Sequence, residues 1–252
     1  MNSDLPKAVL LDLDDTILDD SGGIQNCWRD ACDDYAVGLN GINPGDLYQT
    51  IERTREWFWA DPERHRRGRL DLDDAARKIA ALSLVELGAA DPTVAAKIAT
   101  KYRNLRDERQ QLFPDAVETT RWLRDRGCRL ALVTNGGATL QRKKVERFGL
   151  AELFDCILIE GEVGFGKPDP RIYTRALQEL TVTANDSWMV GDNLKWDVAQ
   201  PQKMGLVGIW VDIRGVGLPV TNGVRPDRIV RGLSELRRCV ARRLKPALYS
   251  SI

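Results

Sequence analysis

Short apolar runs alternate with longer polar stretches along the 252 residues of this chain. The pattern predicts strands at Ala8–Leu13, Arg129–Thr134, Cys156–Glu160, Ser187–Gly191 and Val207–Val211. Several of these runs are apolar at consecutive positions, which is typical of parallel strands covered on both faces. A parallel sheet buried between two layers of helices is therefore expected.

The stretches between the later strands have helical patterns. Predicted helices cover Asp115–Gly127, Thr139–Gly149, Pro168–Leu180 and Asn193–Gly205, several of them stopping at a glycine. From Leu130 onward strand and helix alternate, which requires right-handed βαβ crossovers. The expected fold class is α/β, with a doubly wound, Rossmann-like parallel sheet as the core.

The first strand does not continue into this alternation. After Leu18 and the flexible "DDSGG" turn, helices are predicted at Ile24–Val37, Pro44–Ala60, Leu72–Leu87 and Pro92–Gln111. The stretches "GLNGINPG" and "ADPERHRRGRLD" are predicted to be connecting loops, and "LFPDA" leads back to the core. We therefore expect an all-helical cap at residues 19–112, hinged on a core of residues 1–18 and 113–252.

Composition narrows the function classes. The chain is 43% hydrophobic and 29% charged, and its 37 basic and 37 acidic residues cancel. This balance gives no sign of a nucleic-acid or membrane partner. No apolar run is long enough to span a bilayer, and the early acids of "MNSDLPKAVLLDLDD" do not fit a secretory signal, so a cytoplasmic location is expected. The five cysteines form no CxxC pair and are expected to be free thiols.

Polar side chains gather where the predicted strands end. Asp12 and Asp14 are two residues apart, so both can point the same way as the chain leaves the first strand. Other predicted strand ends are followed by Thr134 and Asn135, by Lys167, and by Asp192, Asn193 and Asp197. Ligands of open α/β sheets bind at this edge. Carboxylates favour Mg²⁺, and a lysine and a hydroxyl beside it can hold phosphoryl oxygens, so a phosphoryl-transfer site is expected.

Four short motifs at these strand ends carry a family resemblance. They are "DLDDT" (Asp12–Thr16), "VTNG" (Val133–Gly136), "GKPDP" (Gly166–Pro170) and "GDNLKWD" (Gly191–Asp197). In order and spacing they resemble the signature motifs of the haloacid dehalogenase superfamily. The resemblance covers the core, residues 7–18 and 113 to about 244. The insertion point resembles that of the helical cap in the first subclass of the superfamily.

The resemblance implies a phosphatase that cleaves a small phosphate monoester through an aspartyl-phosphate. Asp12 would be the nucleophile and Asp14 the general acid and base. Mg²⁺ would be held by the Asp12 and Asp192 carboxylates and the Asp14 backbone carbonyl, with Asp197 nearby. The phosphoryl group would be bound by Thr134 and Lys167, with Asn135 and Gly136 in the same loop.

The basic segment of the cap allows two interpretations. In "WFWADPERHRRGR" (Trp57–Arg69), the aromatic residues can belong to the cap core and the arginines to a solvated loop. Alternatively, the loop is a lid that meets an anionic substrate, with Arg64 as a substrate-binding candidate. Asp15 is expected to shape its turn, and Trp122, Trp188 and Trp210 are expected in the core.

Other functions stay open at this point. A phosphomutase would use the same core and differ in the acceptor of the phosphoryl group. Dehalogenases of the superfamily use no metal and lack the second aspartate of the first motif, here Asp14. A receiver-like phosphoacceptor has similar residues but about half this length, and a non-catalytic protein would show degraded motifs. The substrate and the oligomeric state are not indicated by the sequence.

Overall fold

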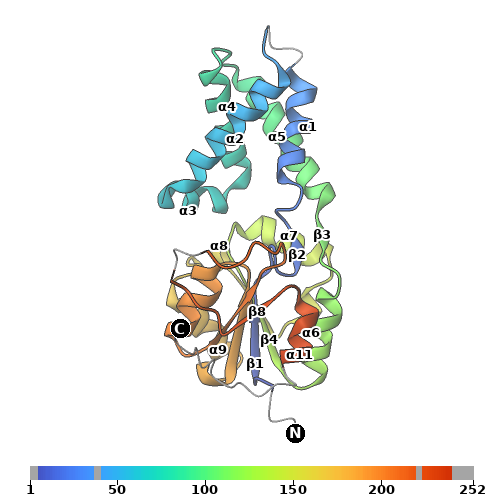
Figure 1. The fold of residues 1–252 in the computed structure, drawn as a ribbon, viewed down its shortest axis with the longest axis vertical. Helices are drawn as coiled ribbons and strands as arrows, with labels where there is room; N and C mark the ends of the chain where they lie inside the picture. Colours follow the sequence, from blue (N-terminus) through green and yellow to red (C-terminus); the bar gives the residue numbers. More distant parts are fainter. Residues whose placement is uncertain (1–4, 37–40, 220–222, 240–252) are drawn as a thin grey trace, which may run out of the picture.

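The structure is a computed structural model that describes residues 5–36, 41–219 and 223–239. It has two parts stacked along the long axis (Figure 1): a group of helices, α1 to α5, and below it a sheet flanked by helices. We call α1 to α5 the helical layer. The chain enters this layer after the first strand of the sheet and returns before the second, as an insertion would.

The sheet confirms the predicted parallel α/β architecture. Its six strands lie in the order β5-β4-β1-β6-β7-β8, and every pairing is parallel. The bounds are β1 Ala8–Leu11, β4 Arg129–Thr134, β5 Cys156–Ile159, β6 Ser187–Gly191, β7 Val207–Val211 and β8 Arg228–Val230. The short edge strand β8 was not predicted, because its three residues include the polar Arg228.

Helices cover both faces of the sheet. They are α6 Ala116–Asp125, α7 Ala138–Arg147, α8 Glu160–Val163, α9 Pro170–Glu179, α10 Gln200–Lys203 and α11 Leu236–Cys239, with short helical turns at Ala151–Leu153, Ala184–Asp186 and Leu233–Glu235. Along β1, Val9 and Leu11 join the core on the side of α6, α7 and α11, whereas Ala8 and Leu10 join the core under α9. The two cores explain why β1 is apolar at every position.

The helical layer has a separate core. Its helices are α1 Ile24–Ala36, α2 Pro44–Ala60, α3 Pro62–Leu70, α4 Leu72–Glu86 and α5 Pro92–Arg109. Buried side chains of α1, α2, α4 and α5 form one cluster, in which the rings of Trp28 and Tyr102 stack at 3.8 Å. These helices fold around each other rather than onto the sheet, so the layer needs only a narrow contact with the core below.

One loop prediction is wrong. The stretch "ADPERHRRGRLD" contains the helix α3, which begins with Asp61 as N-cap and Pro62 in its first turn. The capping signal is present in the sequence, but the helix is strongly polar and has no apolar stripe. Periodicity therefore misses it.

Other boundaries differ less. The predicted helix Asn193–Gly205 is a π-helical segment, η3 Leu194–Ala199, followed by α10. β1 and β5 end earlier than predicted, at Leu11 and Ile159. The expected loop at 38–45 and the helix end at Val37 fall partly on residues 37–40, which lie outside the described ranges.

The two crossings between the parts run side by side. β2 (Leu18–Asp19) pairs antiparallel with β3 (Gln111–Leu112). The entry and exit of the helical layer thus share one small ribbon, at the positions where the sequence predicts the domain boundaries. The division at 18/19 and 112/113 stays a prediction.

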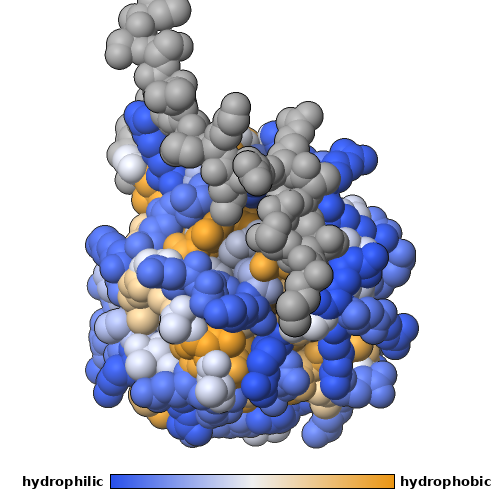
Figure 2. Space-filling view, turned by 90° about the horizontal axis from the view of Figure 1, so that it is seen from below, coloured by the Kyte–Doolittle hydropathy of each residue, from blue (hydrophilic) through white to orange (hydrophobic). Residues whose placement is uncertain are grey.

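Several composition-based expectations can be compared with the structure. Trp188 and Trp210 are buried and Trp122 packs against the sheet core, as expected. Cys27, Cys32, Cys128 and Cys156 are free, whereas the side chain of Cys239 lies outside the description. In the described ranges, no helix has the length and apolar character that crossing a membrane requires. The face seen from below is mostly hydrophilic with scattered hydrophobic groups (Figure 2).

Candidate active site

The parallel pairing of β1 with β4 and β6 brings the predicted motifs to one edge. Leu11 is in register with Leu132 and Val190, so the chain leaves all three strands at nearly the same level. The Asp12 backbone N–H donates to Val190 O at 2.9 Å and extends this alignment by one residue. The first motif is therefore flanked on both sides by the second and fourth.

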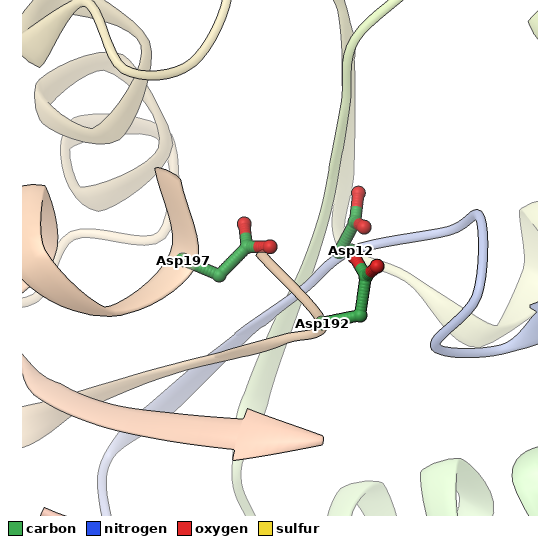
Figure 3. Close-up of side chains that lie close together, drawn as sticks. All are labelled: Asp12, Asp192 and Asp197. Carbon is green, nitrogen blue, oxygen red and sulfur yellow. The ribbon is translucent and has the colours of Figure 1, made fainter. Parts of the chain in front are cut away.

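Three carboxylates converge at this edge (Figure 3). Oxygens of Asp12, Asp192 and Asp197 lie within 4.8 Å of one another. Asp12 follows β1 and Asp192 follows β6, and Asp197 points back from η3 toward the other two. A Cβ atom at Gly191 would come within 2.3 Å of the Asp197 carboxylate, so only glycine allows this approach. We call these three residues the carboxylate cluster.

Lys167 joins two members of the cluster, Asp12 and Asp197. Its side chain is 1% exposed, and its ammonium donates to Asp12 Oδ1 at 2.6 Å and to Asp197 Oδ1 at 2.7 Å. The other Asp197 oxygen accepts the Asn193 N–H at 3.0 Å. Asp197 is thus engaged on both oxygens, which makes it a partner of Lys167 more than a free metal ligand.

The charges of the cluster do not balance. When all three carboxylates are ionised, the one ammonium leaves an excess of two negative charges. Burial raises the pKa of Asp12 to about 7, with Lys167 opposing and Asp197 adding to the shift. Burial also raises the pKa of Asp192 to about 9, and Asp12 and Asp197 add to it. Oxygen donors with uncompensated charge are what a hard divalent cation such as Mg²⁺ requires, so the residues present fit that ion.

Asp192 has the free position that a metal ligand needs. Among the described residues, no donor forms a hydrogen bond to its carboxylate, although its backbone carbonyl accepts Trp210 Nε1–H at 2.7 Å. The indole thus holds the backbone of this turn while the carboxylate stays available. Asp12 likewise uses only Oδ1 in its contact with Lys167.

The loop after β4 is tied to Lys167 and to α7. The side chain of Asn135 donates to Lys167 O and accepts Lys167 N–H, both at 2.7 Å, so it holds the backbone that carries the lysine. Thr134 Oγ1 accepts from Gln141 Nε2 at 2.6 Å. The Gly136 N–H donates to Glu160 Oε2 at 3.1 Å. Asn135 therefore joins this loop to Lys167, and Thr134 and Gly136 stand on either side of it in the chain.

Asp14 lies apart from the carboxylate cluster. Its Oδ1 accepts from Lys144 Nζ at 2.7 Å and its Oδ2 from Gln141 Nε2 at 2.9 Å. Burial raises the pKa of Asp14, an effect that Lys144 opposes. The carboxylate is directed to α7, so any bond from Asp14 to the metal would involve its backbone, as the resemblance implies. Asp15, in a left-handed conformation (φ 56°), accepts the Ser21 N–H at 2.9 Å, in keeping with the expected turn role.

The helix α3 makes one contact of the helical layer with the residues around this site. Arg69 donates to both oxygens of Glu160, at 2.7 and 2.6 Å, and the His65 ring packs edge-on against Trp196. A Cβ at Gly137 would come within 2.3 Å of Leu70 O, so α3 ends directly against the loop after β4.

Arg64, the substrate-binding candidate of the sequence, does not share the contacts of Arg69 with Glu160. Its guanidinium lies 3.7 Å from the centre of the Trp57 ring and donates to the backbone carbonyls of Trp57 and Phe58. None of these contacts supports a role in substrate binding, which stays a prediction.

Sequence reasoning missed three buried polar residues of the site: Gln141, Lys144 and Glu160. Gln141 and Lys144 lie three positions apart in a helix, whereas the motifs that predict the site stand at strand ends. Lys144 also belongs to the basic run Arg142–Lys144, which has the appearance of a solvated helix face. Their spacing on one face of α7 is the only signal that the sequence offers.

Known proteins resemble the chain over this same region. A family model described as haloacid dehalogenase-like hydrolase matches residues 6–205. A phosphoserine phosphatase of Thermus thermophilus is 39% identical over 178 residues, which is 71% of this chain but only 65% of that protein. A glyceraldehyde 3-phosphate phosphatase of Methanopyrus kandleri is 30% identical over 81% of this chain and 82% of the relative.

Solved structures agree with the family model. The crystal structure of a HAD phosphatase from Thermococcus onnurineus matches with a TM-score of 0.63 and 27% identity, over 92% of this chain and 96% of that one. Similar folds include both phosphatases and haloacid dehalogenases. On the family match and the geometry of the four strand-end motifs, the chain belongs to the haloacid dehalogenase-like hydrolases.

Proposed function

We propose that this protein is a Mg²⁺-dependent phosphohydrolase that cleaves a small phosphate monoester through an aspartyl-phosphate. The observation that carries the proposal is Lys167, which bridges Asp12 and Asp197 inside a cluster that also contains Asp192. A buried ammonium beside a nucleophilic carboxylate can receive a phosphate dianion, and the excess acids can receive a divalent cation.

The metal would be held by the carboxylates of Asp12 and Asp192 and the backbone carbonyl of Asp14, with Asp197 supporting the site through Lys167. When bound, Mg²⁺ would neutralise charge on the phosphoryl oxygens. Thr134 and Lys167 would hold the same oxygens through a hydroxyl and an ammonium. Asn135 supports this arrangement by fixing the Lys167 backbone.

The reaction follows from the two aspartates of the first motif. A carboxylate oxygen of Asp12 attacks phosphorus while the bond to the leaving oxygen breaks, and Asp14 gives its proton to that oxygen. Water then attacks phosphorus, the bond to Asp12 breaks, and the proton of the water returns to Asp14. Inorganic phosphate and an alcohol are released, and both aspartates regain their starting states.

Asp14 also distinguishes this proposal from dehalogenation. The sequence pattern of the dehalogenases lacks an acid at this position, and here the acid is present and held by two partners. A phosphomutase stays the second candidate, because it would use the same residues and pass the phosphoryl group to a sugar. Release of free phosphate separates the two.

The relatives narrow the substrate class. Their names, phosphoserine phosphatase and glyceraldehyde 3-phosphate phosphatase, denote activities on small phosphate esters of three carbons. We infer a small phosphorylated metabolite as the substrate, with α3 closing the site as part of a cap of residues 19–112. The free thiols support a reducing, cytoplasmic setting.

A phosphate-release screen tests the proposal. The purified chain is given a panel that includes O-phosphoserine, glyceraldehyde 3-phosphate, several sugar phosphates and p-nitrophenyl phosphate, with Mg²⁺ or with EDTA. We expect phosphate release from at least one alkyl phosphate, only with Mg²⁺. Turnover that is equal in EDTA would contradict the metal assignment, and isomerised sugar phosphate without free phosphate would favour the phosphomutase.

A further inference from the structure

The acid of the proposed reaction is held by a helix rather than by the strand ends. Gln141 and Lys144 occupy one face of α7, three residues apart, and each binds a different oxygen of the Asp14 carboxylate. Both side chains are buried, at 2% and 3% exposure. Asp14 therefore has both oxygens engaged, which determines the direction in which its carboxylate points.

Lys144 also binds a second acid. Its ammonium donates to Asp20 Oδ1 at 3.0 Å, and Asp20 in turn accepts from Gln110 Nε2 at 2.6 Å and from Arg106. Arg106 belongs to the last turn of α5, and Gln110 follows it. A continuous line of hydrogen-bonded side chains thus runs from the helical layer through Asp20 and Lys144 to Asp14. We call it the α5–α7 line.

Gln141 connects the line to the phosphate-binding loop. The nitrogen that donates to Asp14 also lies 2.6 Å from Thr134 Oγ1 and 2.9 Å from Asn135 O. An amide nitrogen has two hydrogens, so these three acceptors share them. The position of Asp14 is therefore set relative to the hydroxyl that would hold the phosphoryl group.

The charges argue against a metal or anion role for this group. Asp14 and Asp20 are matched by Lys144 and Arg106, so no excess charge is left for a ligand to neutralise. A charge-balanced network stabilises one geometry when its basic members are buried and both oxygens of each aspartate are hydrogen-bonded, as they are here. Asp14 is the most exposed of the four charged members, with 29% of its side chain accessible, so the network can contribute to the reaction by placing this carboxylate.

We propose that Lys144, together with Gln141, is a positioning residue that holds the Asp14 carboxylate for proton transfer, and that Asp20 links this position to the helical layer. The inference rests on the proposed function, in which Asp14 protonates the leaving oxygen. Proton transfer by a positioned side chain contributes about 10²–10⁴-fold, and part of this factor is lost when the carboxylate turns away.

The test compares two leaving groups. p-Nitrophenol leaves without a proton, whereas the alcohol of an alkyl phosphate needs one, so the ratio of the two kcat/KM values reports acid catalysis in the first step. The substrates are p-nitrophenyl phosphate and the alkyl phosphate that the screen finds fastest. Lys144→Met should lower kcat/KM for the alkyl phosphate at least about tenfold more than for p-nitrophenyl phosphate. Asp14→Asn should change the ratio further in the same direction.

Matched variants separate positioning from general damage. Lys143→Met removes the neighbouring lysine, which is exposed and pairs with Asp107 of α5 at 2.7 Å. It should leave the ratio unchanged. Lys144→Arg should have a ratio between those of Lys144→Met and the unmodified protein, because it keeps a cation at this position. Asp20→Asn keeps Lys144 and Asp14 and should shift the ratio by a smaller factor.

The outcomes are distinct. The proposal would be overturned if folded Lys144→Met left the ratio of the two kcat/KM values unchanged, whether or not both values fell. The link to the helical layer would be overturned if Asp20→Asn left this ratio unchanged. If Lys144→Met does not fold, Gln141→Leu takes its place, and it should lower kcat/KM for the alkyl phosphate more than for p-nitrophenyl phosphate. If Asp14→Asn leaves the ratio unchanged, Asp14 is not the acid, and the proposed function and this inference both fail. If the ratio changes in Asp14→Asn but not in Lys144→Met, only the positioning role of Lys144 fails, and Asp14 stays the acid of the proposed function.

Discussion

Two clusters of this molecule are built from the same parts. In each, a buried lysine bridges two aspartates: Lys167 joins Asp12 to Asp197, and Lys144 joins Asp14 to Asp20. The first cluster has a third carboxylate and no second cation, whereas the second has Arg106. The first is left with excess negative charge, and the second is balanced.

This difference in charge distinguishes a cluster that can bind a ligand from one that only holds other side chains in place. Burial and neighbouring acids raise the pKa of Asp192 to about 9, so the first cluster lacks positive charge that a ligand can supply. In the second cluster, burial favours protonated Asp20, but Lys144 and Arg106 outweigh it and hold its pKa below the usual range. A buried lysine between acids is thus not itself a mark of catalysis, because the remaining charge determines what the group can bind.

The largest expected effect is at the nucleophile. Asp12→Asn removes the attacking oxygen while keeping the size of the side chain, so phosphate release should fall by at least about 10⁴-fold. Asp19→Asn is a suitable control, since Asp19 pairs with Arg214 outside both clusters and should keep activity. Phosphate release from Asp12→Asn within tenfold of the unmodified protein would exclude Asp12 as the nucleophile.

The two lysines should differ in stability. Removing one partner of a buried ion pair costs about 3–5 kcal/mol, and Lys167→Met leaves three carboxylates together, whereas Lys144→Met leaves Asp20 with Arg106. We expect Lys167→Met to be the less stable variant in urea unfolding, with Mg²⁺ restoring part of its free energy of unfolding. Equal losses with no response to Mg²⁺ would show that excess charge does not distinguish the clusters.

Metal binding should stabilise the unmodified protein. At about 100 times its dissociation constant, Mg²⁺ should add about 2.7 kcal/mol to the free energy of unfolding. Asp192→Asn removes a proposed ligand and should weaken this effect, whereas Asp20→Asn should leave it unchanged. Thermal unfolding with and without Mg²⁺ measures both, and an equal rise in Tm for Asp192→Asn would contradict the ligand assignment.

A smaller effect concerns acid stability. The pKa of Asp20 is lowered in the folded state, so its contribution is present above the unfolded pKa near 4 and is lost as pH falls below it. Between pH 5 and pH 3, the free energy of unfolding should therefore fall by about 1–2 kcal/mol less in Asp20→Asn than in the unmodified protein. Urea unfolding at both pH values measures the difference, and parallel pH profiles for the two proteins would argue against it.

The smallest effects separate two arginines of α3. Arg69 binds Glu160, which also holds the Gly136 N–H, so Arg69→Ala should raise KM about fivefold, equal to about 1 kcal/mol. Arg64 stacks on Trp57 away from these contacts, so the KM of Arg64→Ala should stay within about twofold of that of the unmodified protein. The reverse order in steady-state kinetics would restore the substrate role that the sequence suggests for Arg64.

Local patterns predicted most of the fold and the strand-end part of the site. The strand β4 and the helix α2 have the predicted bounds, because their apolar patterns and caps are local. The polar helix α3 and the π-helical segment η3 were missed as such, since neither has a distinctive apolar period. The role of Arg64 was inferred from composition, which cannot tell which arginine of a basic helix faces the site.

The order of motifs along the chain was sufficient to predict the parallel sheet and the family, because parallel strands necessarily bring their carboxyl ends to one edge. The sequence could not show that Lys144 pairs with Asp14 and Asp20, which are 130 and 124 positions away. Nor could it show that Arg106 balances their charge. These residues become partners only when α5 and α7 pack near the end of β1. Burial of their charges there requires that each be paired with an opposite charge.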